Sequence, residues 1–171
     1  IEWLNKCSRS RKNATHSVVM GDFHTLAARS SGGRDKRLNM EGRRFYKEIE
    51  AGNRALDILL SGINPNIECI FIKGNHEDRQ SRYVAVHSEL AGEPNTIPTL
   101  LRLASRKVKW IPYKDYYILG GISFTHIPFG KAKEIQGKDI CSKAELVTTT
   151  SIVFGHTHEL HTSCVHKHGM K

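Results

Sequence analysis

Two strand-like apolar runs, each ending in a glycine and a group of metal-competent side chains, constrain this fold more than any other feature. The first run, 67–72, leads into Gly74–Asp78, and the second, 150–154, leads into Gly155–His158. The two histidines of the second group are two positions apart, so they lie on the same side if the extended geometry continues. Packing explains such a pair poorly. Together with the Asn-His pair of the first group, it predicts a metal centre with nitrogen and oxygen ligands.

The apolar pattern predicts alternating helices and strands, followed by a region of mostly strands. Strands are expected at 17–20, 67–72, 108–111, 116–119, 122–125 and 150–154, with a further strand near Val165. Helices are expected at 1–12, 41–61, 77–90 and 99–106, loops at 25–40 and 92–98, and a hairpin turn at Gly120-Gly121. This order is typical of a single α/β domain over 1–171 with a mixed sheet, in which 25–40 is a surface loop or insertion. The metal-competent residues fall at carboxyl ends of strands, where open α/β sheets build ligand sites.

Composition supports a folded domain. The chain has 171 residues, 39% of them hydrophobic, which is enough for one domain with its own core. No apolar run has the length of a membrane span and no signal-peptide pattern opens the chain, so we expect a cytoplasmic location. The start at Ile1 lacks Met and resembles the middle of an amphipathic helix, so we expect that an N-terminal segment is missing.

Cysteine usage limits how a metal is held. The four cysteines are widely spaced, at Cys7, Cys69, Cys141 and Cys164. No pair has the C-x-x-C spacing of a zinc or redox site, which indicates free thiols in a reducing compartment. Any metal is therefore held by His, Asp and Asn side chains.

The chain carries an excess of positive charge. Its net charge is +9, and its Lys and Arg residues cluster at 34–37, at 43–47 and at 131–138. Such an excess attracts polyanions, including nucleic acid. An ordinary solvated face is the other interpretation, and the sequence leaves both open.

The metal-competent residues meet the requirements of phosphate-ester hydrolysis. Two metal ions about 3.5–4 Å apart can activate water and neutralise phosphoryl oxygens. Asp22 can bridge two ions, and Asn75 offers a neutral carbonyl oxygen. His76 can face the substrate as the general acid. The remaining ligands are imidazoles, from His126, His156 and His158.

Several of these residues also have a structural alternative. Asp22 can form an Asx turn or cap a helix, and Asn75 can be a left-handed turn residue. A lone His126 can be a hydrogen-bonded structural histidine. All of these alternatives would have to hold at once, which favours the metal centre.

The order of these residues resembles the motifs of the calcineurin-like metallophosphoesterase superfamily. The family pattern is D-x-H, G-D, G-N-H-[DE], H and G-H-x-H. Within 21–158 the chain carries Gly21-Asp22, Gly74-Asn75-His76-Glu77, His126 and Gly155-His156-Thr157-His158. Arg37-Leu38-Asn39 and Gly74–Arg79 are similar to a bacterial and phage-borne branch. The resemblance implies a two-sheet β-sandwich flanked by helices, an αββα fold, with a dinuclear metal site at one edge.

The family's D-x-H motif leaves two registers open. Only Asp22-Phe23-His24 has this form. In the first register Asp22 is the bridging residue of the G-D motif, and D-x-H lay before Ile1. In the second, Asp22 and His24 are the D-x-H motif and G-D is missing. One expected helix and one expected strand separate His24 from Gly74, without a second Gly-Asp, which favours the first register.

The first register implies two unequal metal sites. Asn75, His126 and His156 belong to one metal, with Asp22 shared. His158 belongs to the other metal, which lacks its two D-x-H ligands in this chain. We therefore expect one well-formed site and one weak site. His24, in contrast, is a ligand only in the second register.

The resulting expectation is a metal-dependent phosphoesterase that hydrolyses phosphate mono- or diesters, with nucleotides or nucleic acid as candidate substrates. Metal-bound hydroxide attacks phosphorus and His76 protonates the leaving group. Mixed His, Asp and Asn ligation suits Mn²⁺, Fe or Zn²⁺, with Ni²⁺ and Co²⁺ as further candidates. Arg79 and Arg82 either reach substrate phosphate or are helix-surface charges. The sequence Phe23-His24-Thr25 departs from the G-D-x-V-D-R-G motif of Ser/Thr protein phosphatases and argues against that activity.

The alternative is a non-catalytic module with a phosphoesterase fold. Such a module would bind nucleic acid through the basic segment 29–47, or a partner protein, without turnover. Asn75, His76 and His156 are all present, which favours an enzyme. A chain that lacks its first motif would itself be inactive.

Overall fold

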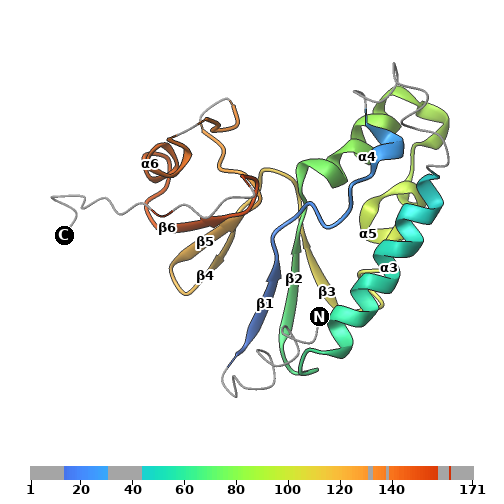
Figure 1. Cartoon of the computed structure of the whole chain (residues 1–171), viewed down its shortest axis with the longest axis horizontal. Helices are drawn as coiled ribbons and strands as arrows, with labels where there is room; N and C mark the ends of the chain where they lie inside the picture. The colour runs from blue at the N-terminus through green and yellow to red at the C-terminus, as the bar shows by residue number, and fades with distance from the viewer. Residues whose placement is uncertain (1–13, 31–43, 131–132, 138, 158–161, 163–171) are drawn as a thin grey trace, which may run out of the picture.

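The computed structural model describes residues 14–30, 44–130, 133–137, 139–157 and 162 (Figure 1). Its strands are β1 (His16–Val19), β2 (Glu68–Ile72), β3 (Val108–Ile111), β4 (Tyr117–Leu119), β5 (Ile122–Thr125) and β6 (Ser151–Phe154). Its helices are α3 (Phe45–Ser61), α4 (Asn75–Val86), α5 (Ile97–Leu100) and α6 (Ile140–Glu145), with 3-10 helices η1 (Ala27–Arg29), η3 (Ser88–Leu90) and η4 (Glu93–Asn95). None of the described helices has both the length and the apolarity needed to cross a membrane.

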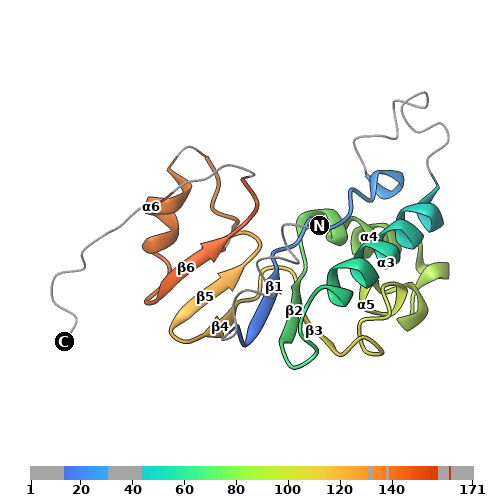
Figure 2. The ribbon, with the colours of Figure 1, turned by 60° about the horizontal axis from the view of Figure 1, so that its bottom comes forward.

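The first sheet is all-parallel, in the order β1-β2-β3. Side chains of a strand alternate between the two faces, so Phe71 of β2 points opposite to Ile70 and Ile72. On its own face, Phe71 packs against the buried side of α3, formed by Ile49 and Leu56. Helices α3, α4 and α5 gather beyond this sheet, on the side away from β4, β5 and β6 (Figure 2).

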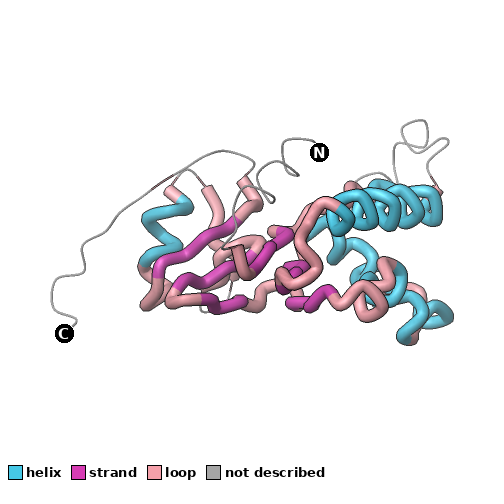
Figure 3. The backbone as a smooth tube through the Cα atoms, turned by 90° about the horizontal axis from the view of Figure 1, so that it is seen from below, coloured by secondary structure: helices cyan, strands magenta, loops and turns pink. Residues whose placement is uncertain are grey.

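The second sheet is mixed, in the order β4-β5-β6. β4 and β5 form an antiparallel hairpin through Gly120 and Gly121, whose φ values of 56° and 78° suit a tight hairpin turn. β6 runs parallel to β5, and α6 lies beside β6 (Figure 3). Apolar side chains join the two sheets, because Ile70 and Ile72 form a buried cluster against which Tyr117 and Phe124 of the second sheet pack.

The coarse expectation of an α/β fold is confirmed, and the strands predicted between 17 and 154 and the hairpin are present within a residue of their expected bounds. The mixed sheet expected from the apolar pattern is only partly right, because the described strands form two separate sheets, of which the first is all-parallel and the second is mixed. The chain order could not reveal this, since a strand run does not state which neighbour it pairs with.

The helix expected at 99–106 is also wrong. Helix α5 occupies Ile97–Leu100, and turns follow it. Pro98 accounts for the difference, because proline is favoured in the first turn of a helix, so α5 begins before it. η4 and the start of α5 lie within the expected loop 92–98, and α6 lies in a segment for which no helix was expected.

Several expectations fall outside the described residues. These are the helix at 1–12, the part of the 25–40 loop from 31 onward, and the strand near Val165. The described beginning of the predicted loop, 25–30, contains the short helix η1.

Candidate metal centre

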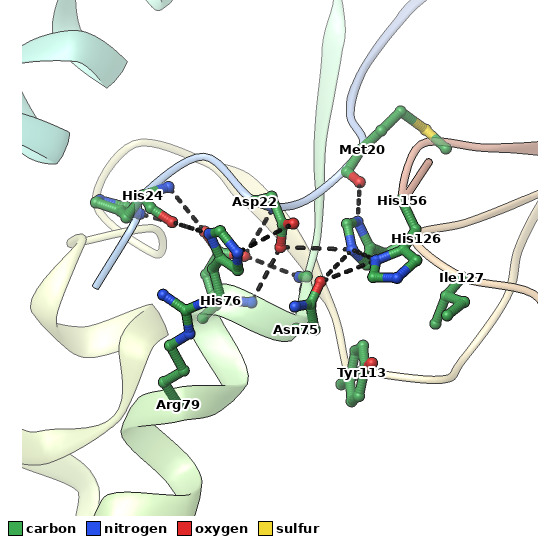
Figure 4. A network of polar contacts seen from close by, with 12 residues as sticks. Met20, Asp22, His24, Asn75, His76, Arg79, Tyr113, His126, Ile127 and His156 are labelled. Atoms are coloured by element: carbon green, nitrogen blue, oxygen red, sulfur yellow. Dashed lines mark hydrogen bonds and ion pairs between the residues drawn. The ribbon is translucent and has the colours of Figure 1, made fainter. Parts of the chain in front are cut away.

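Four strand ends bring metal-competent side chains together. Asp22 follows β1, Asn75 follows β2, His126 follows β5 and His156 follows β6. One ligand atom from each of Asp22, His126 and His156 lies within 4.8 Å of the others, so the three residues form a group that can hold a metal ion. Asn75 contacts both histidines, and Figure 4 shows the four side chains pointing toward one another.

His126 is fixed with one ring nitrogen aimed at this cluster. The residue is 1% exposed, and its Nδ1 lies 2.7 Å from the carbonyl oxygen of Met20. A carbonyl oxygen can only accept, so Nδ1 carries the proton and Nε2 keeps its lone pair. Nε2 lies 2.8 Å from Asn75 Oδ1 and 3.4 Å from Asp22 Oδ1. A hydrogen bond from the second nitrogen is the usual way in which proteins orient a metal-binding histidine.

His156 reaches the cluster from the end of β6. The backbone N–H groups of Gly155 and His156 both donate to the carbonyl oxygen of His126, at 3.1 Å. This shared acceptor joins the ends of β5 and β6. It brings His156 Nδ1 to 3.2 Å from His126 Nε2 and to 3.0 Å from Asn75 Oδ1. Two imidazole nitrogens at this separation can bind a common ion.

The Asn75 side chain faces a set of electron-pair donors. Its inward amide atom lies 2.8 Å from His126 Nε2, 3.0 Å from His156 Nδ1, and 3.1 and 3.0 Å from the two oxygens of Asp22. If the amide presents its NH₂ group there, it donates a hydrogen bond to these acceptors. If it presents its oxygen, a cation or a proton must lie among them. The amide can thus satisfy the cluster without an ion and can supply the predicted neutral oxygen ligand when an ion binds.

Asp22 is held in an unusual backbone conformation. Its φ is 50° and that of Gly21 is 84°, both in the left-handed region. Gly21 also has no room for a side chain, since a Cβ atom there would lie 2.6 Å from His126 Nδ1. Asp22 Oδ1 accepts the backbone N–H of His76 at 3.0 Å, in the first turn of α4. Asp22 therefore caps a helix, as its structural alternative proposed, and also takes part in the metal-competent cluster.

Glu77 organises the backbone of the centre, and we assigned it no role from the sequence. It is 0% exposed. Its Oε2 accepts the N–H groups of Asp22 and Gly74 at 2.9 Å, and its Oε1 accepts the N–H of His24 at 3.0 Å. Burial raises the pKa of Glu77, but hydrogen bonds and charge from His24, with the Gly74 N–H, outweigh it and lower the pKa below its usual value. The sequence signal that could have identified Glu77 is its place as the fourth residue of the G-N-H-E motif.

His76 lies on the opposite side of Asp22 from His126 and His156 (Figure 4). Its Nδ1 lies 3.2 Å from the carbonyl oxygen of His24 and therefore carries a proton. Its Nε2 lies 3.8 Å from Asp22 Oδ2, and 26% of the side chain is exposed. The ring is thus oriented by the backbone and is partly exposed.

His24 is turned away from the cluster. It is 6% exposed, and its Nδ1 lies 3.4 Å from Glu77 Oε1. Its Nε2 is buried, has no hydrogen-bond partner among the described residues, and faces α3 where a Cβ atom on Gly52 would lie only 1.7 Å away. In this geometry His24 packs between α3 and α4 and does not join Asp22, His126 and His156.

Tyr113 borders the centre and was not singled out from the sequence. Its ring centroid lies 6.4 Å from that of His126, and its hydroxyl donates to Glu134 at 2.8 Å. Burial, and then the hydrogen bond and charge of Glu134, raise the pKa of Tyr113, so the hydroxyl stays protonated. No spacing pattern marks this residue in the sequence.

Of the predicted site residues, Asp22, Asn75, His76, His126 and His156 lie at the centre, and His158 lies outside the described residues. Comparisons with protein-family models, with curated proteins and with solved structures find no match to this chain.

Proposed function

We propose that the chain is a metal-dependent phosphoesterase, related to the calcineurin-like metallophosphoesterases, that hydrolyses phosphate mono- or diesters. The observation that carries the proposal is the convergence of the Asp22 carboxylate with His126 Nε2 and His156 Nδ1. Asp22 stands more than a hundred positions before the two histidines along the chain, yet each of the three stands in the motif that the family order requires. A chance cluster has no reason to follow that order.

We extend the proposal to the fold, as the αββα sandwich that this resemblance implies. Its support is the apolar contact between the two sheets, from Ile70 and Ile72 to Tyr117 and Phe124. On the opposite face of the first sheet, Phe71 packs with α3. This arrangement puts the ligand-bearing strand ends of both sheets at one edge.

The donor set fits a divalent transition metal. One carboxylate, two imidazole nitrogens and one amide oxygen are a mixed nitrogen and oxygen set that suits Mn²⁺, Fe or Zn²⁺, and Ni²⁺ or Co²⁺ as well. When bound, such an ion activates water and neutralises the oxygens of the substrate phosphate. The Met20 carbonyl keeps the His126 lone pair directed inward, and Glu77 fixes the backbone on which Asp22 stands.

His76 is the proposed general acid. The His24 carbonyl holds its Nδ1–H, so a proton carried on Nε2 can pass to the leaving oxygen on the exposed side of the ring. Arg79 and Arg82, on the same helix, are the proposed contacts to substrate phosphate.

Isothermal titration calorimetry with Mn²⁺ and Zn²⁺ tests the centre directly. The wild-type chain should bind one ion tightly and a second, held through His158, weakly. His156→Ala removes one ligand and should weaken the tight site at least about tenfold. His16→Ala is the matched control, because His16 stands at the other end of β1 beside Glu68. Equal binding by wild type and His156→Ala refutes the centre, and two equal tight sites refute the first register.

Hydrolysis of p-nitrophenyl phosphate and bis-p-nitrophenyl phosphate with added Mn²⁺ tests the activity. Turnover that His156→Ala abolishes and His16→Ala retains supports the phosphoesterase. If neither this chain nor a form extended upstream of Ile1 turns over either ester with the ion bound, the second candidate is favoured, a phosphoesterase-fold module that binds nucleic acid. That candidate is favoured by the net charge of +9 and by the arginines beside Asn75.

A further inference from the structure

A basic cavity of about 320 Å³ adjoins the candidate metal centre. Arg29, Arg79 and Arg82 line it, and Asn75 belongs both to its wall and to the metal-competent cluster. Its lining therefore offers three guanidinium groups and contains no carboxylate. A cavity of this composition attracts an anion beside the point where the proposed metal ion binds.

The cavity follows one face of α4. Asn75, Arg79 and Arg82 are four and three positions apart, a spacing that places side chains on the same side of a helix. With a rise of about 1.5 Å per residue, the backbone of Arg79 lies about 6 Å and that of Arg82 about 10 Å along the axis from Asn75. The Arg82 guanidinium folds back toward the centre, because its Nη2 donates to the Asn75 carbonyl oxygen, and the Arg29 guanidinium lies over Tyr83, the residue after Arg82. Figure 4 shows Arg79 next to His76 on this helix.

Neighbouring groups orient Arg79 and Arg82 but use only some of their N–H donors. Arg79 Nη1 donates to the carbonyl oxygen of Thr25. Arg82 Nη2 donates to the carbonyl oxygen of Asn75 at 3.3 Å, and Arg82 Nε pairs with Asp78 at 3.3 Å. Each guanidinium has five N–H donors, so each keeps donors for an anion after these contacts.

Arg29 is held by stacking rather than by an ion pair. Its guanidinium lies 3.7 Å from the ring centroid of Tyr83 and 4.3 Å from that of Phe45. Its Nε is buried, with no hydrogen-bond partner in the described part of the chain. The ring of His87 stacks on Tyr83 at 4.2 Å between centroids. The Tyr83 ring is thus engaged by both the Arg29 guanidinium and the His87 ring.

We propose that this cavity is a subsite for a second phosphate of the substrate, and that the substrate is a phosphodiester strand such as single-stranded nucleic acid. The inference rests on the proposed function, because it takes the metal centre as the place of the scissile phosphate. The lining of the cavity runs from Asn75 to Val86, about 16 Å along the axis of α4, which favours phosphates separated by a sugar. The two phosphates of a pyrophosphate share one oxygen and are too close together to extend along it.

Fluorescence anisotropy with a labelled oligo-dT, in EDTA so that no hydrolysis occurs, tests the subsite independently of turnover. Arg82→Gln should raise the Kd about tenfold, as the loss of a hydrogen bond to a charged group does. It should also reduce the slope of log K against log salt by about 0.7, the value for one phosphate contact on a single strand. The side chain is 61% exposed, and Asp78 keeps Lys73 at 2.6 Å, so the fold should tolerate the change.

Arg54→Gln is the matched control. Arg54 lies on α3, is 62% exposed, and pairs with Glu50 at the same spacing of four residues as Arg82 pairs with Asp78. Its Kd and salt slope should match those of the wild type. An Arg82→Gln variant that binds like the control overturns the subsite. Unlabelled pyrophosphate, inorganic phosphate and oligo-dT are compared as competitors of the labelled oligo-dT. If pyrophosphate competes at the same phosphate concentration as unlabelled oligo-dT, while inorganic phosphate does not compete, the strand is overturned as the occupant.

The two proposals fail in different measurements. Arg82-dependent binding in EDTA, without metal-dependent turnover by this chain or by a form extended upstream of Ile1, leaves the basic subsite in place and rejects the phosphoesterase. Metal-dependent turnover with oligo-dT binding that does not depend on Arg82 leaves the phosphoesterase and rejects the subsite.

Discussion

Replacing Glu77 by Gln tests whether a buried carboxylate holds the backbone of the candidate centre. One Glu77 oxygen accepts the N–H groups of Asp22 and Gly74, and the other accepts the N–H of His24. Gln has nearly the same shape but only one acceptor oxygen. Its NH₂ group must face N–H donors at the other position, so at least one hydrogen bond is lost and a buried donor stays unpaired.

The expected loss of stability follows from these bonds. A hydrogen bond to a charged group contributes about 1.5–3 kcal/mol and a neutral one about 0.5–1.5 kcal/mol. One lost hydrogen bond and two weakened ones should lower the free energy of unfolding by about 3–5 kcal/mol. Because Gln removes a buried charge, the net loss should be about 3 kcal/mol. A domain is stable by only about 5–15 kcal/mol, so the change removes a large fraction of the total.

Urea denaturation followed by far-ultraviolet circular dichroism measures this loss. Glu50→Gln is the control, because Glu50 is 64% exposed and pairs only with Arg54 on the surface of α3 among the contacts described, so its effect should stay below about 0.5 kcal/mol. A Glu77→Gln variant that unfolds within about 1 kcal/mol of the wild type would refute the role of Glu77 as the organiser of this backbone.

The dependence on pH has a definite sign. The folded pKa of Glu77 is lowered below its ordinary value of 4.5. Its stabilising contribution is therefore complete above pH 4.5 and is lost as the pH falls through the lower folded value. The difference in free energy of unfolding between wild type and Glu77→Gln should become smaller over that acidic range and stay constant at neutral pH.

Three further predictions concern residues around the centre. Gly52→Ala places a Cβ atom 1.7 Å from His24 Nε2, so it should lower stability by more than about 2 kcal/mol in urea denaturation. Tyr113→Phe removes the 2.8 Å hydrogen bond to Glu134 and should lower stability by about 1 kcal/mol, with Mn²⁺ affinity by calorimetry unchanged. His76→Ala should slow diester hydrolysis about 10²–10⁴-fold and leave Mn²⁺ affinity intact, and an unchanged rate would remove His76 from the mechanism.

The strands and the site were predictable where local chemistry decides the structure. An apolar run such as 68–72 has one stable environment, a buried strand, and Gly120-Gly121 has the left-handed freedom that a hairpin turn needs. The carboxyl ends of parallel strands meet at one edge, so polar residues after β1 and β2 had to lie close together. His126 and His156 were predicted as ligands because each follows an expected strand, and the family resemblance assigned them to the same metal as Asn75, with Asp22 shared.

The remaining features depend on contacts between distant parts of the chain. The two sheets pack together through Ile70 and Ile72 against Phe124, a contact between distant segments that no local window contains. The burial of His24 depends on a glycine in α3, at position 52, whose missing side chain makes the space. Glu77 resembles any charged residue in the first turn of a helix until the loop after β1 is placed against it.

The G-N-H-E segment works as one unit with the loop after β1. The His76 N–H binds the Asp22 carboxylate, and the Glu77 carboxylate binds the Asp22 N–H, so each side holds the other. These reciprocal bonds offset the strain of the left-handed φ of 50°, which is of order 1–3 kcal/mol for a residue other than glycine. Asp22 can therefore cap α4 and face the imidazoles with the same side chain. Asn75 and Arg82 both belong to α4, the helix that these bonds join to the loop after β1. A phosphate bound along α4 therefore contacts the same helix that positions the ligands of the metal centre.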